Sequence, residues 1–345
     1  MKLKLSFAVV LLCAANVSYA ADPVYIPRVI NSPKYFFDKP LSTVVDATGN
    51  VWVVNSSYTH NKPSVTEIPI ASPNTPIIFR GSEYGFSLPA EITADADGNI
   101  WVANRNSTLN TFSVTEIPVS NPTDPKNYWG AAYQFFAPIS ITSDSEKNIW
   151  VVNSKVDKVT ELVYVPPSYY TPKVFSNDDG KFAGATEIAA DKQGNIWITN
   201  FENNSVTEMV GPNHDTYKTY SGIDYHFSIP TGITVDKDGN IWVANYKGNS
   251  VTELVAVNSY APKNFPGINN PRLLTSDLDG NIWISNSDSN SVTVIFKAHP
   301  DTPVTYQGEA YGFHHPTGIA SDKQGNIWIT NRDNNSMTEL VRNMG

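Results

Sequence analysis

Short runs of alternating apolar and polar residues recur along the whole chain, and each run ends at a cluster of turn residues. In one copy the runs are 230–235, 241–244 and 250–255, with Asp-Lys-Asp-Gly-Asn at 236–240 between the first two. Alternation with period two is typical of β-strands, and a glycine in a tight turn can adopt positive φ. The pattern predicts three short antiparallel strands in this copy, followed by a less regular fourth strand at 263–265.

The sequence repeats this unit seven times, and each copy places a Trp six residues after an Asp. The aligned residues are Asp46, Asp95, Asp144, Asp191, Asp236, Asp277 and Asp322, with Trp52, Trp101, Trp150, Trp197, Trp242, Trp283 and Trp328. Successive copies lie 49, 49, 47, 45, 41 and 45 residues apart. Four short strands in a unit of this period indicate one blade of a β-propeller. We therefore predict an all-β fold, a seven-bladed propeller of four-stranded blades, with repeats starting near 40, 89, 138, 185, 230, 271 and 316.

The two ends of the repeat array predict how the ring closes. The last copy stops after its third strand, at 337–341, whereas 24–30 reads as a strand that no first three precede. An unpaired strand edge would otherwise be exposed at each end of the array. We expect 24–30 to be the fourth strand of the last blade, so that 21–345 forms a single propeller domain.

The N-terminus has the features of a secretory signal peptide. Lys2 and Lys4 precede an apolar run at 5–17, and Ser-Tyr-Ala at 18–20 matches a small-x-small cleavage site. We expect residues 1–20 to be removed and the protein to be exported, to the periplasm or out of the cell. The apolar run is too short to span a bilayer, and no later segment reaches the necessary length.

Composition narrows the classes of partner and chemistry. The formal net charge of −9 becomes −11 once the two lysines of the leader are removed, and the only Cys, Cys13, is removed with them. An acidic protein is a poor partner for nucleic acid or for an anionic lipid surface. Without a cysteine in the mature chain, thiol chemistry is excluded. We expect a monomer with no membrane span and no nucleic-acid partner.

The repeat resembles a known group of propellers. The pattern Pro-x-Gly-Ile-x-x-Asp-x-x-Gly-Asn-Ile-Trp-Val-x-Asn-x-x-x-Asn-Ser-Val is similar to that of NHL-repeat propellers and of streptogramin (virginiamycin B) lyase-like proteins, over residues 24–341. The resemblance implies a propeller that is a lyase, a lactonase or an interaction scaffold. It also implies, for a lyase, a Glu at the end of the second strand and histidines that hold a divalent metal together with acids. Here the positions that match this Glu are Asn55, Asn104, Asn153, Asn200, Asn245, Asn286 and Asn331.

Positions that repeat in all copies are explained by the blade, so positions that depart from the repeat are the candidates for function. The repeated Trp is expected to fill the gap between blades, and the acids of the third strand to form structural pairs. Four residues before the Asp, where the first strand enters the central channel, the copies have Ser42, Glu91, Ser140, Glu187, Gly232, Leu273 and Gly318, and Arg272 comes one residue earlier in its copy. Glu91, Glu187 and Arg272 should converge near the ring axis, where ligands usually bind. Arg272 then either holds a ligand carboxylate or neutralises the two acids, in which case the three form a plug.

Loops on the same face carry two further sets of candidates. A Tyr-x-Phe motif precedes the first strand in five copies, and its Tyr, including Tyr84, Tyr133, Tyr225 and Tyr311, either lines a binding surface or packs within the blade. The Phe of the motif is expected to plug the top of each blade. His226, His314 and His315, with acids nearby, either hold a divalent metal or are exposed or packed loop residues.

These observations favour an exported NHL-type propeller that binds a ligand or a protein through its channel-mouth face. The alternative is a metal-dependent enzyme, similar to streptogramin lyases or lactonases, that uses His226, His314 and His315. A structural scaffold of the cell envelope is a third possibility. Whether any catalysis occurs, and whether a divalent metal is a cofactor, is left open by the sequence.

Overall fold

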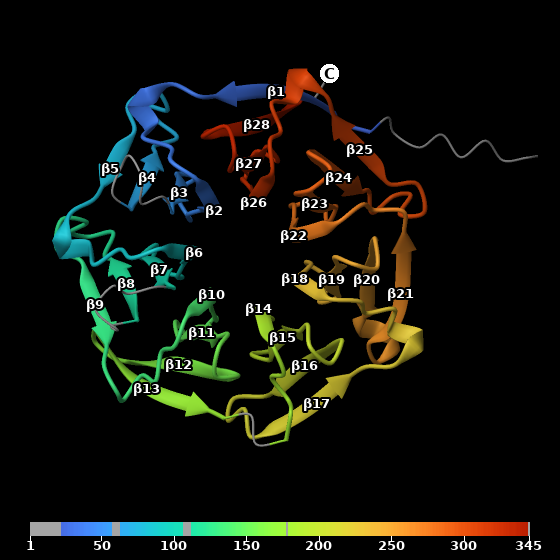
Figure 1. The fold of residues 1–345 in the computed structure, drawn as a ribbon, viewed down its shortest axis with the longest axis horizontal. Coiled ribbons are helices and arrows are strands. Elements are labelled where there is room, and N and C mark those ends of the chain that lie inside the picture. Colours follow the sequence, from blue (N-terminus) through green and yellow to red (C-terminus); the bar gives the residue numbers. More distant parts are fainter. Residues whose placement is uncertain (1–21, 57–62, 106–111, 177–178, 344–345) are drawn as a thin grey trace, which may run out of the picture.

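The computed structural model describes residues 22–56, 63–105, 112–176 and 179–343. Seven four-stranded antiparallel sheets surround a central axis, each with its first strand innermost (Figure 1). The prediction of an all-β, seven-bladed propeller is confirmed. The predicted signal peptide, residues 1–20, lies outside the described residues. No helix in the described part of the chain is long and apolar enough to cross a membrane.

The strands are named by blade, from the axis outwards. Blade one contains β2 (Pro40–Val45), β3 (Val51–Asn55), β4 (Ser64–Ile68) and β5 (Ile77–Phe79), and blade two β6 (Pro89–Ala94), β7 (Ile100–Asn104), β8 (Ser113–Ile117) and β9 (Lys126–Trp129). Blade three contains β10 (Pro138–Ser143), β11 (Ile149–Asn153), β12 (Lys158–Val165) and β13 (Tyr169–Phe175), and blade four β14 (Ala185–Ala190), β15 (Ile196–Asn200), β16 (Ser205–Val210) and β17 (Thr216–Tyr220). Blade five contains β18 (Pro230–Val235), β19 (Ile241–Asn245), β20 (Ser250–Val255) and β21 (Ala261–Pro266), and blade six β22 (Pro271–Ser276), β23 (Ile282–Asn286), β24 (Ser291–Ile295) and β25 (Val304–Gln307). Blade seven contains β26 (Pro316–Ser321), β27 (Ile327–Asn331), β28 (Ser336–Asn343) and β1 (Val24–Ile30).

Short 3₁₀ helices interrupt the connections between strands. They are η1 (Pro33–Tyr35), η2 (Ser82–Tyr84), η3 (Ile223–Tyr225), η4 (Ala256–Asn258) and η5 (Glu309–Tyr311). Four of them, η1, η2, η3 and η5, lie in the crossings that lead from an outermost strand to the innermost strand of the next blade. These crossings and the loops between second and third strands lie on one face of the ring, which we call the mouth face. The turns between first and second strands lie on the opposite face, the turn face.

The ring closes as the sequence predicts. β1 pairs antiparallel with β28, from Val24 opposite Asn343 to Ile30 opposite Met337. Tyr25 of β1 also packs edge-on against Trp283 of blade six, with ring centroids 4.6 Å apart. The first described strand of the chain is therefore the outermost strand of the last blade, and the expected closure is confirmed.

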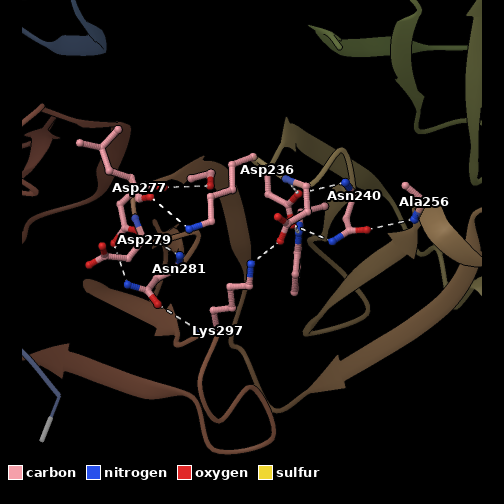
Figure 2. Close-up of polar contacts among 12 residues, drawn as sticks. Asp236, Asn240, Ala256, Asp277, Asp279, Asn281 and Lys297 are labelled. Atoms are coloured by element: carbon pink, nitrogen blue, oxygen red, sulfur yellow. Dashed lines mark hydrogen bonds and ion pairs between the residues drawn. The ribbon is translucent and has the colours of Figure 1, made fainter. Parts of the chain in front are cut away.

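The repeated Asp and Trp build the turn between the first two strands. In blade five the Trp242 indole Nε1 donates to Asp236 Oδ2 at 2.9 Å, and the Asn240 backbone N donates to Asp236 Oδ1 at 3.0 Å. Asn240 Oδ1 in turn accepts from the Ala256 backbone N at 3.0 Å, which ties the turn to the end of the third strand. Figure 2 shows this unit beside the matching Asp277 and Asn281 of blade six. The strongest sequence repeat is thus explained by the backbone of the turn.

The repeated Trp also fills the space between blades, as expected. Trp52 of blade one packs against Ile92 and Ile100 of blade two. Trp150 of blade three packs in the same way against Ile188 and Ile196 of blade four. Each indole thus buries a large apolar surface while its N–H is satisfied by the Asp of the turn.

In blades two, four and seven the acid of the third strand forms an ion pair with a cation on the fourth strand of its own blade. Glu116 faces Lys126, and Lys126 Nζ lies 3.2 Å from Glu116 Oε1. Blade six has two valines instead, Val294 opposite Val304. The expected structural pairing is therefore found across the outer two strands, where opposite charges stabilise a sheet. In blade one Glu67 faces Ile77, so burial raises the pKa of its carboxyl to about 7.

Candidate ligand site at the channel mouth

A cavity of about 210 Å³ lies on the ring axis and opens to the mouth face. All seven blades line it, mostly through the first residues of their innermost strands. One lining residue from each blade, in order, is Ser42, Glu91, Ile139, Glu187, Thr231, Arg272 and Thr317. The structure therefore brings Glu91, Glu187 and Arg272 to one cavity.

A β-bulge directs these side chains to the axis. The register of every innermost strand shifts just after its first residue, which is Pro in six blades and Ala185 in blade four, as between Pro89 and Glu91 of β6. A bulge re-aims side chains at the end of a strand, so that two consecutive residues can face the same side. Ala90 and Glu91 both line the cavity for this reason. Alternation in the sequence does not show this feature, since it assigns neighbouring residues to opposite faces.

Glu91 and Glu187 belong to blades two and four, and blade three connects them. The Ile141 backbone N donates to Glu91 Oε2 at 2.8 Å. Ser140 Oγ donates to Glu187 Oε1 at 2.9 Å and accepts from the Ile188 backbone N at 3.2 Å. Ser140 is fully buried. A polar network thus runs across three innermost strands at the floor of the cavity.

The two carboxyl groups also hydrogen-bond to each other. Burial raises the pKa of Glu91. Burial, together with the charge of Glu91, raises the pKa of Glu187 well above its ordinary value. A hydrogen bond between two carboxyl groups needs a proton on one of them, and two adjacent carboxylates resist ionising together. The pair therefore shares one proton and carries one negative charge over the range between its two macroscopic pKa values.

Arg272 lies across the cavity, on β22 of blade six. Burial and the positive charge of Arg332 lower its pKa, although Arg remains protonated at any ordinary pH. Among the described residues, no ion pair or hydrogen bond joins the Arg272 guanidinium to Glu91 or Glu187. The carboxyl groups are hydrogen-bonded to each other and to blade three, whereas the Arg272 side chain, although largely surrounded by protein, keeps solvent-exposed surface in the cavity.

The tyrosines of the Tyr-x-Phe motif pack along their own motifs. Tyr84 stacks on Phe86 with centroids 5.4 Å apart, and its hydroxyl donates to the Pro122 carbonyl at 3.0 Å. Tyr133, Tyr225 and Tyr311 each stack on the Phe two residues later with centroids 5.5 Å apart. The cavity wall contains none of these four tyrosines. Tyr84 is buried, and the other three are half-buried.

The histidines lie on the mouth face in two separate crossings, with His226 before blade five and His314 and His315 before blade seven. His226 follows η3 in a left-handed conformation and is exposed, as is His314. His315 Nδ1 lies 4.0 Å from Asp333 Oδ2. Within the described ranges, no three His, Cys, Asp or Glu side chains come together as a metal site requires. These donors do not fit the divalent metal that the resemblance implies for a lyase.

The amides that replace the lyase Glu are structural in this chain. Asn245 Nδ2 donates to Ser250 Oγ at 3.2 Å and to Thr252 Oγ1 at 2.9 Å. Thr252 Oγ1 donates onward to the Tyr225 carbonyl at 2.9 Å. All seven of these asparagines are buried. Each one ties its second strand to the third strand, and in six of the blades the Thr continues the link to the crossing from the previous blade.

Comparison with known proteins places the chain among propellers of this type. The model of the virginiamycin B lyase family matches residues 129–343. The chain belongs to this family. No curated protein sequence matches it significantly.

Solved structures show the family fold over almost the whole chain. A streptogramin B lyase has 16% identity and a TM-score of 0.75, over 92% of this chain and 98% of that one. A catalytically inactive virginiamycin B lyase from Staphylococcus aureus with quinupristin has 16% identity and a TM-score of 0.75, over 92% and 99%. The extracellular domain of a putative one-component system from B. thetaiotaomicron has 14% identity and a TM-score of 0.67, over 93% and 42%. At such low identity the likeness shows a shared fold and leaves activity to be argued from the site.

Proposed function

We propose that this member of the virginiamycin B lyase family is an exported binding module that takes a ligand at its channel mouth. The observation that carries the proposal is the axial cavity, whose polar wall is made by Glu91, Glu187 and Arg272. These residues depart from the repeat, so blade architecture alone does not require them. A concave site with a few convergent polar groups and perturbed carboxyl pKa values is the usual setting for ligand binding.

Export is supported by the basic and apolar character of residues 1–20, which reads as a signal peptide. Binding, rather than metal-dependent catalysis, is favoured by the side chains present. The buried Asn245 and its equivalents take the place of the lyase Glu, and their side-chain N–H groups are used within the blades. The charged side chains Glu91, Glu187 and Arg272 line the cavity instead. The ligand is either a small molecule or a short protein segment that enters the mouth.

The test is retention of ligands by the purified protein. Wild type is incubated with a soluble small-molecule extract and a peptide mixture, separated from unbound compounds by gel filtration, and analysed by mass spectrometry after denaturation. We expect a Glu187→Gln/Arg272→Gln variant to lose the retained compounds, because it removes the positive charge of Arg272 and the carboxyl group of Glu187 from the cavity lining. Circular dichroism and the melting temperature show that the variant is folded.

A matched control changes the same charges on the turn face. Glu146→Gln/Lys192→Gln also removes one acid and one cation, at exposed positions far from the mouth. It should retain the same compounds as wild type. Equal retention by wild type and the mouth variant, with only a lower melting temperature in the variant, would show that the cavity residues are a structural plug.

A further inference from the structure

Two arginines lie near each other at the channel mouth, and one of them, Arg272, lines the axial cavity. Arg272 lies near the start of β22 in blade six, and Arg332 follows β27 in the neighbouring blade seven. They are close enough for the charge of Arg332 to lower the pKa of Arg272. Over the described residues, no hydrogen bond or ion pair engages either guanidinium. Elsewhere in this acidic chain cations are paired across blades, for example Arg342 with Asp279 and Lys147 with Asp97.

The nearest acids do not saturate these arginines. Asp288 lies close enough to influence Arg272, but its Oδ2 already accepts the Tyr246 hydroxyl. Glu187 is engaged by Ser140 and by Glu91. Two like charges side by side repel each other, and their planar donors match the oxygens of a carboxylate or phosphate. An anion at this place would relieve the repulsion and use the free donors.

The opposite wall of the same cavity carries groups that can accept hydrogen bonds. Glu91 and Glu187 share a proton and present carboxyl oxygens, so a ligand hydroxyl or amino group can donate to them. The cavity of about 210 Å³ is smaller than the roughly 300–1,000 Å³ of typical drug-sized sites. A phosphate carries up to two negative charges and would be repelled by the negative charge of the pair. A carboxylate carries one.

We propose that the channel mouth binds a small carboxylate that carries a hydroxyl or amino group, with the carboxylate on Arg272, near the charge of Arg332, and the donor on the Glu91–Glu187 pair. This inference rests on the proposed function and names the class of ligand. The two ends of such a ligand match the two walls of one cavity. A carboxylate without a donor satisfies only the arginines, and a neutral amide satisfies only the acids.

Three-carbon probes test each half of the match. Lactate, alanine, propionate and lactamide share one skeleton and differ in the donor or in the carboxylate, and inorganic phosphate tests the other anion class. Their dissociation constants are measured at pH 7 by ligand-observed NMR titration of the full mature chain. We expect lactate or alanine to bind about tenfold more tightly than propionate, lactamide or phosphate, since a hydrogen bond to a charged group contributes roughly this much.

Variants then assign the contacts. Arg272→Gln should weaken lactate or alanine binding by about tenfold, and Arg332→Gln, which removes only a nearby charge, should weaken it less. Arg272→Lys should restore only part of it, because Lys lacks the planar fork. Arg80→Gln is the control, since Arg80 is exposed and stacks on Phe36 outside the cavity. It should bind the probes as wild type does.

Several results would overturn the inference. They are absence of binding for every carboxylate probe, tighter binding of phosphate, or binding that Arg272→Gln leaves unchanged. If retention of compounds in the gel-filtration test still depends on Glu187 and Arg272, only the carboxylate class is wrong. If that dependence is absent as well, the proposed function fails with it.

Discussion

The innermost strands on the two sides of the axis use the same repeat position in different ways. In blades two to four this position holds Glu91, Ser140 and Glu187, whose side chains form a hydrogen-bonded network. In blades five and seven it holds Gly232 and Gly318. A Cβ at Gly232 would lie 2.4 Å from the Arg272 carbonyl oxygen, and one at Gly318 would lie 2.8 Å from Ser42 Cα. One side of the channel is joined through side chains, and the other through direct contact of backbones.

The comparison shows what a departure from the repeat can mean. Gly232 and Gly318 differ from the other copies because neighbouring strands leave no room for a side chain, so packing explains them. Glu91 and Glu187 differ from the other copies without such a steric reason, and they face a cavity. Only the carboxyl groups therefore indicate a ligand site, and substitutions at the glycines and at the acidic network should have different effects.

The largest effect is expected where backbones touch. Gly318→Val places a branched side chain where Ser42 Cα, the Thr43 backbone N and Thr330 Oγ1 lie within 2.9 Å of the new Cβ. Overpacking of this kind costs about 1–3 kcal/mol or more, because the innermost strands of blades seven and one must move apart. Urea unfolding measures the loss in the free energy of unfolding.

Leu273→Val is the control, since it changes side-chain volume at the same repeat position without a close backbone contact. It should cost less than Gly318→Val. An unfolding free energy for Gly318→Val equal to that of wild type would show that the glycine side of the ring is as tolerant as the acidic side. The proposed distinction between the two sides would then be wrong.

The sequence predicts the repeated blade structure better than it predicts the arrangement of side chains at the ring axis. The Asp, Trp and Asn of the repeat could be assigned to the blade because seven copies agree, and the closure by residues 24–30 followed from the missing fourth strand. The convergence of Glu91, Glu187 and Arg272 followed from topology.

Three features at the axis could not be derived from the sequence. The bulge near the start of each innermost strand depends on its pairing with the second strand, and the link through Ser140 and the close approach at Gly318 depend on distances between blades. Local pattern carries no information on those distances. Arg332 was missed for the same reason, since it lies at the end of a second strand in a loop that varies between copies.

A smaller effect is expected from the serine that links the two acids. Ser140→Ala removes an Oγ that donates to Glu187 and accepts from the buried Ile188 N–H. Leaving such groups unsatisfied costs about 1–3 kcal/mol. Ser42→Ala is the matched control at the same repeat position of blade one, where no side-chain hydrogen bond is found among the described residues. Equal urea midpoints for the two variants would contradict a network that spans blades two to four.

The smallest effect at neutral pH, and the most specific, concerns the shared proton. Glu187 holds its proton more tightly in the folded protein than in the unfolded chain, where the pKa is 4.5. The folded state therefore binds more protons, and the unfolding free energy of wild type falls as pH rises above 4.5, by at most about 1.4 kcal/mol per pH unit for one proton. This decrease in the unfolding free energy ends once the pH exceeds the pKa of Glu187 in the folded protein.

Glu187→Gln removes this proton and the repulsion on Glu91, so the unfolding free energy of wild type minus that of the variant should fall as pH rises from 4.5 to the folded pKa of Glu187. Other buried acids, such as Glu161 and Glu253 with pKa values raised to about 7, titrate in both proteins and cancel in the difference. Glu309→Gln, at an exposed position on the mouth face, should give a flat difference. A flat or rising difference for Glu187→Gln would mean that the two carboxyl groups do not share a proton, and that the acidic side of the channel is held together by Ser140 and the backbone alone.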